Sequence, residues 1–127
     1  MVDNVSADFS EVERLVVNMG RVSAKVVAAS VPVVGKALLN IKMDTRANIS
    51  DHPSWKRLPQ TVNYEQVGLS GEVGYDDVGQ GELAGIHDFG SATHAPHPTL
   101  YPAAAREVPN FEKALGDVAA KVTEAIL

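Results

Sequence analysis

The sequence predicts an α+β fold with a long kinked N-terminal helix, a small antiparallel sheet with a hairpin, and a C-terminal amphipathic helix. Three observations lead to this class. Apolar residues recur at three- and four-residue intervals through the first fifty residues, which is the period of an amphipathic helix. The same period returns after residue 109. Between the two, residues 61–77 alternate in polarity around a glycine-containing turn, which is typical of a hairpin.

The first helix is predicted to begin near Glu11, because Ser10 and Glu13 have the spacing of a capping box. Its apolar stripe consists of Val12, Leu15, Val16, Met19, Val22, Val26 and Val27. Pro32 has no N–H to donate, so we expect the helix to stop or kink near Ser30. The stripe then resumes at Val34, Leu38, Ile41, Thr45 and Ile49. The region is therefore either one kinked helix or two helices in tandem.

The middle of the chain predicts a hairpin. Residues 50–60 contain two prolines and form a connecting loop, after which residues 61–67 and 71–77 form the strands. Glycines at positions 68, 71 and 74 weaken both strands and indicate a bulge. Two strands alone are marginal in water, so we expect further strands from the loops or from a neighbouring subunit.

Two helical segments are predicted after the hairpin. Residues 83–90 form one or two turns that end at Gly90. The C-terminal helix is expected to begin with Pro109 in its first turn. Its apolar stripe consists of Phe111, Leu115, Val118, Val122 and Ile126.

Composition limits the function classes. A length of 127 residues with 45% hydrophobic content predicts a single domain, residues 1–127. The absence of cysteine excludes disulfides, thiolate zinc sites and cysteine nucleophiles. A net charge of −5 with scattered Lys and Arg argues against sequence-reading DNA binding. The first residues do not resemble a signal peptide and no run of 18 apolar residues occurs, so we expect a soluble protein with no membrane partner.

Residues 87–109 contain three of the four histidines, one aspartate and four prolines. His87, Asp88, His94 and His97 are suitable zinc ligands and would support a small metal-dependent hydrolase. However, prolines flank His97 on both sides, so it does not share a helical face with His94, and no HExxH-type helix supplies a general base. We therefore predict no metal site, no cofactor and no catalytic residue, and we interpret these histidines as solvated or interface groups. Trp55, in the proline-flanked loop, is either the anchor of a satellite core or an interface residue.

Residues 81–115, "GELAGIHDFGSATHAPHPTLYPAAAREVPNFEKAL", carry a family resemblance. They contain Asp-Phe-Gly-Ser, a proline-containing loop, Leu100, a Pro-Ala pair at 102–103 and a closing amphipathic helix. This order is similar to the C-terminal signature of the tail-completion or neck proteins of long-tailed double-stranded-DNA bacteriophages, which are related to minor tail protein Z of lambda-like phages. The chain departs from many relatives at residues 44–48, where Asp-Thr-Arg-Ala-Asn replaces their Asp-Thr-Gly-x-Leu turn.

The resemblance implies a structural virion protein at the head–tail junction, made in the host cytoplasm. Such a protein would form a homo-oligomeric ring, with six-fold symmetry expected, between the connector and the tail tube. Its partners would be other junction and tail proteins, and DNA would pass through the ring without sequence-specific binding. A tail-terminator or head-closure protein of the same junction is the alternative within this class. No enzymatic activity is implied.

In this interpretation the loop is an interface. Its prolines restrict the backbone, so that less entropy is lost on docking. The interface residues would be Phe89, Leu100 and Tyr101 as anchors, His94 and His97 as rim groups, and Trp55.

Overall fold

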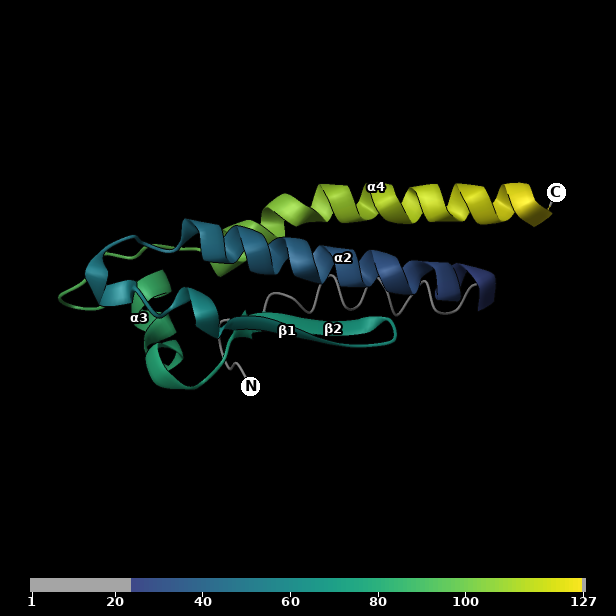
Figure 1. Ribbon diagram of the computed structural model, residues 1–127. Coiled ribbons are helices and arrows are strands. Elements are labelled where there is room, and N and C mark those ends of the chain that lie inside the picture. The colour runs from purple at the N-terminus through teal and green to yellow at the C-terminus, as the bar shows by residue number, and fades with distance from the viewer. Residues whose placement is uncertain (1–23, 127) are drawn as a thin grey trace.

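The computed structural model describes residues 24–126 and confirms the α+β class (Figure 1). The elements in chain order are α2 (Ala24–Asn48), the 3₁₀ turns η2 (Pro53–Trp55) and η3 (Pro59–Thr61), β1 (Val62–Val67), β2 (Ser70–Tyr75), η4 (Gly79–Leu83), α3 (Ala84–Phe89) and α4 (Leu100–Ile126). The predicted helix start near Glu11 and its capping box lie outside the described residues.

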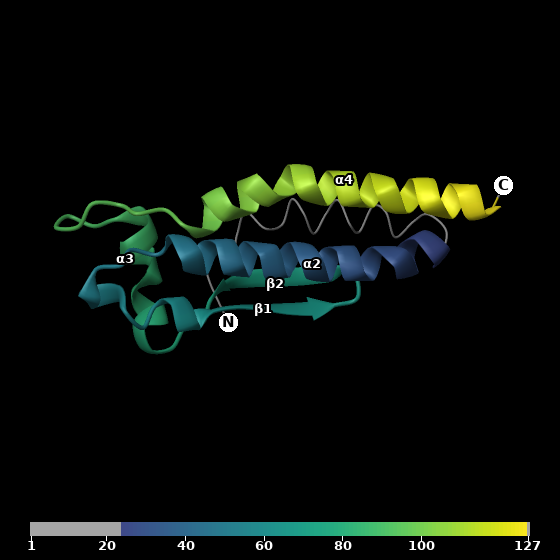
Figure 2. The ribbon, with the colours of Figure 1, turned by 45° about the horizontal axis from the view of Figure 1, so that its top comes forward.

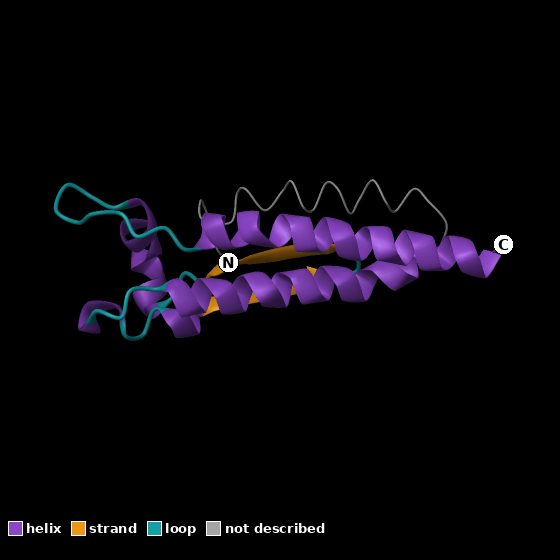
Figure 3. Cartoon of the chain, turned by 90° about the horizontal axis from the view of Figure 1, so that it is seen from above, coloured by secondary structure: helices purple, strands orange, loops and turns teal. Residues whose placement is uncertain are grey.

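The helix α2 is the middle layer of the fold. It lies between α4 and the β1–β2 hairpin, as Figures 1 and 2 show together. Seen from above, α2 and α4 run side by side over most of their length (Figure 3). The small helix α3 and the irregular segments gather at one end of this assembly, away from the C-terminal end of α4.

The helix α2 continues through Pro32, so the predicted stop near Ser30 and the tandem alternative are wrong. The Ser30 hydroxyl donates to the Val26 carbonyl at 2.6 Å inside the helix, a contact that favours bending. The carbonyl that Pro32 leaves without a helical donor belongs to Ala28, an exposed residue whose backbone water can reach. Figure 2 shows α2 changing direction near its N-terminal end, which agrees with the kinked alternative.

The stripe predicted after the proline is confirmed as the main contribution of α2 to the core. Its members are Val34, Leu38, Ile41 and Thr45, all buried, with Ile49 buried just beyond the helix end. By length and mean hydropathy, 1.5 over 18 residues, α2 would also be able to cross a membrane, a property that core helices of globular proteins share. Its buried face packs here against the hairpin and α4.

Residues 44–48, where the chain departs from the neck-protein pattern, form the last turns of α2 instead of a separate turn. Two of these residues, Asp44 and Arg46, form hydrogen bonds with neighbouring elements. Arg46 donates to the Val62 carbonyl at 2.8 and 3.1 Å, which ties α2 to the start of β1. Asp44 accepts from Arg106 of α4 at 2.8 and 2.9 Å. This end of α2 is thus joined to both of its neighbours.

The hairpin is regular. Pairing runs without interruption from Val62↔Tyr75 to Val67↔Ser70, so the indicated bulge is wrong. Gly68, with φ of +59°, makes the turn. Gly71 has a different role, because a Cβ there would lie 2.4 Å from a methyl carbon of Leu38, and its absence lets the hairpin lie close on α2. Within residues 24–126 no third strand pairs with the hairpin; α2 covers one of its faces instead.

The C-terminal helix begins at Leu100, nine residues before the predicted start, and Pro109 lies inside it. The carbonyl that Pro109 leaves without a helical donor belongs to Ala105, which is exposed. Figure 2 shows α4 bent in this part. Phe111 and Leu115 of the predicted stripe are buried, and Val118 and Val122 are partly buried. The side chain of Ile126 lies outside the described residues.

Leu115→Ala should lower the free energy of unfolding by about 2–5 kcal/mol, because Leu115 is 5% exposed and its truncation leaves a cavity in the core. Denaturant unfolding would measure the change. Glu112→Ala, on the exposed side of the same helix, is the control and should change stability by less than about 0.5 kcal/mol. A Leu115→Ala change as small as the control would show that this side chain is not part of the core.

Candidate protein interface

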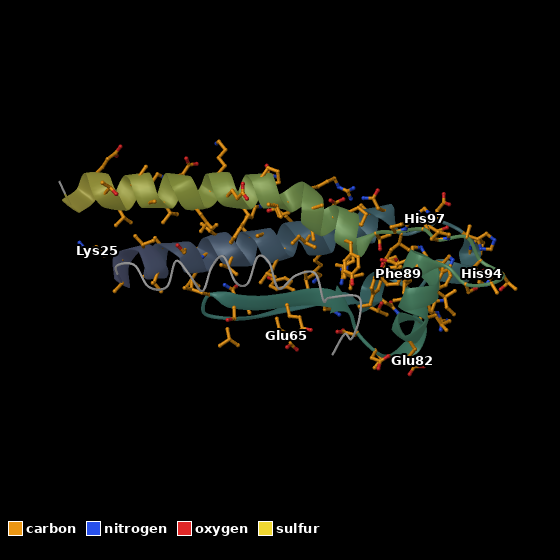
Figure 4. The ribbon with its side chains drawn as sticks, turned by 180° about the vertical axis from the view of Figure 1, so that it is seen from behind. Lys25, Glu65, Glu82, Phe89, His94 and His97 are labelled. Atoms are coloured by element: carbon orange, nitrogen blue, oxygen red, sulfur yellow. The ribbon has the colours of Figure 1, made fainter. Side chains whose placement is uncertain are left out.

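The candidate interface is the end of the molecule formed by α3, the loop of residues 91–98 and the first turn of α4. All eight loop residues are exposed. Figure 4 shows His94 and His97 at this end, with Phe89 on the neighbouring α3. The phenyl ring of Phe89, a residue that is 50% exposed, lies 5.5 Å from the ring of Tyr101, which is partly buried. The two form an aromatic pair at the surface.

Backbone contacts give the loop a defined path. Gly90 has a φ of +78°, and a Cβ there would lie 2.8 Å from the carbonyl oxygen of His94, so glycine is required at this turn. The Ser91 N–H donates to the same carbonyl at 2.9 Å. At the other end of the loop, the His97 N–H donates to the His87 carbonyl at 2.8 Å. The loop is exposed but held at both ends.

Beneath the loop lies a buried polar cluster centred on Asp88, which is 2% exposed. Its carboxylate accepts from the backbone N–H groups of Thr99 and Leu100 at 3.3 and 3.2 Å, at the start of α4. The Thr99 hydroxyl lies 2.9 Å from both carboxylate oxygens. The Tyr75 hydroxyl donates to Asp88 at 3.2 Å and also hydrogen-bonds with the Thr99 hydroxyl. Asp88 of α3 therefore caps α4, where a negative charge also interacts favourably with the helix dipole.

Burial raises the pKa of the Tyr75 hydroxyl far above its ordinary value of about 10, and the negative charge of Asp88 raises it further. Tyr75 is 1% exposed and stays protonated throughout the physiological range. It can therefore act as a permanent hydrogen-bond donor from β2.

His87 connects this cluster to the end of α2. Its Nδ1 lies 2.8 Å from an Asp88 oxygen, and its Nε2 accepts from the Ser50 N–H at 3.2 Å. These partners require the proton on Nδ1 and the lone pair on Nε2, which fixes the tautomer. The ring also meets the rings of Trp55 and His97 edge-on, at 4.9 and 5.0 Å between centroids.

The four residues considered as zinc ligands do not converge on a common point. His87 and Asp88 use their polar atoms in the buried cluster, and His97 Nε2 lies 2.8 Å from the Asn48 carbonyl oxygen. His94 is exposed on the loop. Across residues 24–126 no three His, Asp or Glu side chains are grouped so as to hold a metal ion. The contacts favour a structural role for these histidines.

Of the proposed interface residues, some are accessible at the surface and the others pack in or against the core. Phe89, His94 and His97 are exposed at this end of the molecule, and Tyr101 is partly buried. Leu100, expected as an anchor, is 2% exposed and belongs to the core, so it is not available to a partner in this conformation. Trp55 is partly buried and packs against the core and His87, which agrees with the satellite-core interpretation.

Sequence reasoning missed the roles of Tyr75 and Thr99. One local signal was present, because Thr99 is a common N-cap residue and Pro102 follows in the first turn, a position that proline tolerates. That pattern would have placed the helix start at Leu100.

Comparison with protein-family models, with curated proteins and with solved structures gives no match to this chain. The similarity of residues 81–115 to phage neck proteins therefore remains a resemblance.

Asp88→Asn should lower the free energy of unfolding by at least about 2 kcal/mol, because the amide would turn a donor toward groups that are themselves donors. Thermal and denaturant unfolding would measure the effect. Asp51→Asn, at an exposed position, is the matched control and should be nearly neutral. Equal stability of the two variants would mean that the buried cluster does not hold this end of the fold together.

The tyrosine pKa predicts a loss of stability in alkali. Above a pH of about 10 the unfolded chain ionises Tyr75 while the folded chain does not, so the unfolding free energy should fall as pH rises. Tyr75→Phe should remove this contribution, and the stability difference between the wild type and the variant should narrow above that pH. Denaturant midpoints measured from pH 7 to 11 would test it. A constant difference would contradict the raised pKa.

Proposed function

We propose that this protein is a structural component of the head–tail junction of a long-tailed bacteriophage, where copies assemble into a ring. The observation that supports it best is the surface formed by Phe89, Tyr101 and residues 91–98. This surface is exposed, contains aromatic side chains and is supported from below by the Asp88 cluster.

The physical argument is preorganisation. A loop that is held at both ends, and that contains Pro96 and Pro98, loses little conformational entropy when it docks. A half-exposed aromatic residue such as Phe89 supplies large contact area at low entropic cost. His94 and His97 are exposed at the same end of the molecule and can serve as polar rim groups that form single hydrogen bonds with a neighbour or with water.

In the ring, each copy would present this surface to the next copy or to an adjoining junction protein. The ring would join the connector to the tail tube, and DNA would pass through it without sequence-specific contacts. The net charge of −5 is compatible with that passage, because an excess of carboxylates over cations does not favour retention of DNA. The role is structural and the place is the virion. A tail-terminator or head-closure protein would use the same kind of surface, and the genes flanking this one would discriminate between them.

Phe89→Ser should weaken self-association at least tenfold, which corresponds to about 1.4 kcal/mol, because it removes an apolar contact at the proposed interface. Light scattering over a concentration series, with negative-stain images of the largest species, would measure it. Val67→Ser, at an 83% exposed residue of the hairpin, is the control and should assemble as the wild type does.

Circular dichroism should show that both variants keep the wild-type fold. If the wild type stays monomeric at every concentration and with candidate junction partners, the ring proposal fails. If it assembles and Phe89→Ser assembles equally well, a ring forms through a different surface.

A further inference from the structure

A groove runs between α2 and α4, away from the loop end of the molecule. Its cavity measures about 240 Å³ and its walls are largely apolar. The apolar residues that line it are Pro32, Val33, Ala37, Phe111 and Ala114. Pro109 lies in the bent part of α4 beside the groove, between two of its polar lining residues.

One carboxylate lies in this apolar groove. Glu107 is 8% exposed. Its Oε2 accepts from the Asn40 side-chain amide at 2.9 Å, and its Oε1 accepts from the Asn110 amide at 3.3 Å. Among the ion pairs of residues 24–126 none includes Glu107, although Lys36 also lines the groove. Asp88 is also buried without a cation, but many donors surround it, whereas Glu107 has two side-chain amide donors and no cation among the described residues. Buried charges in proteins are generally paired, so Glu107 can accept a cationic partner.

We propose that the groove receives the side chain of an arginine from a partner protein. Each Glu107 oxygen is engaged by one amide and has a further lone pair, so the carboxylate can accept two parallel N–H bonds from a guanidinium. The apolar walls suit the methylene stem of arginine. A guanidinium is also more weakly hydrated than an ammonium, which favours arginine over lysine in this setting. This inference uses a surface separate from the proposed ring contact and does not depend on it.

The probe is N-ethylguanidinium chloride, titrated into the full chain at constant ionic strength. Nitrogen-15 NMR would follow the side-chain amide signals of Asn40 and Asn110, whose nitrogens contact Glu107 directly. We expect a saturable shift of both signals. Ethylammonium chloride at the same concentrations should bind more weakly because it cannot form the two parallel bonds.

Two variants and one control make the test specific. Glu107→Gln should weaken binding of the guanidinium at least tenfold, whereas Glu112→Gln, at an exposed position of the same helix, should bind as the wild type does. Lys36→Glu changes an exposed residue at the groove and should tighten binding by replacing a cation with an anion. It also keeps the test valid if Glu107→Gln folds poorly.

Shifts that do not saturate, or that are equally strong for ethylammonium, would overturn the proposal. So would unchanged binding in Lys36→Glu or in a folded Glu107→Gln. Tighter binding in Lys36→Glu together with loss in Glu107→Gln would support it.

Discussion

The hydrogen bonding of the Asp88 carboxylate is the interaction on which the loop end of this structure depends. Asp88 is a residue of α3, yet its oxygens meet donors from β2 through Tyr75 and from the start of α4 through Thr99 and Leu100. Its neighbour His87 extends the same network to Ser50, just after α2. Residues from four parts of the chain are thus joined to the Asp88 carboxylate, three of them directly and Ser50 through His87. The position of Phe89, the next residue, follows from that arrangement.

The regular elements could be predicted because their information is local. The stripe from Val34 to Thr45 and the hairpin around its glycine turn are visible within a few residues of sequence, and both are found in the structure. The predicted alternation is not complete, because residues 73–75 at the end of β2 are all buried. The role of Gly71 was not visible in that way. It looks like a weak point of a strand, and only the packing of Leu38 against it shows that the missing side chain permits the contact.

The errors at the prolines and at Leu100 share one physical origin, because proline and the exposed loop were both treated as local properties. Pro32 and Pro109 both lie inside helices. Each proline removes the hydrogen-bond donor of one backbone carbonyl, and in both helices that carbonyl belongs to an exposed alanine, where water can replace the donor. Leu100 was expected as an anchor of the proline-containing interface loop, yet it is a core residue. The Asp88 carboxylate, which caps the helix that begins at Leu100, lies twelve residues earlier in the chain. No pattern within one element contains that information, so the Asp88 cluster required the tertiary structure.

The position of α2 between α4 and the hairpin gives the molecule a long axis (Figures 1 and 3). The 27 residues of α4 span about 40 Å at a rise of 1.5 Å per residue, from the aromatic pair to the opposite end. The helix α2 lies beside α4 over most of that length, so the loop end and the C-terminal end of α4 lie far apart on the same rod of two helices. Contacts at the two ends can also form at the same time without steric competition.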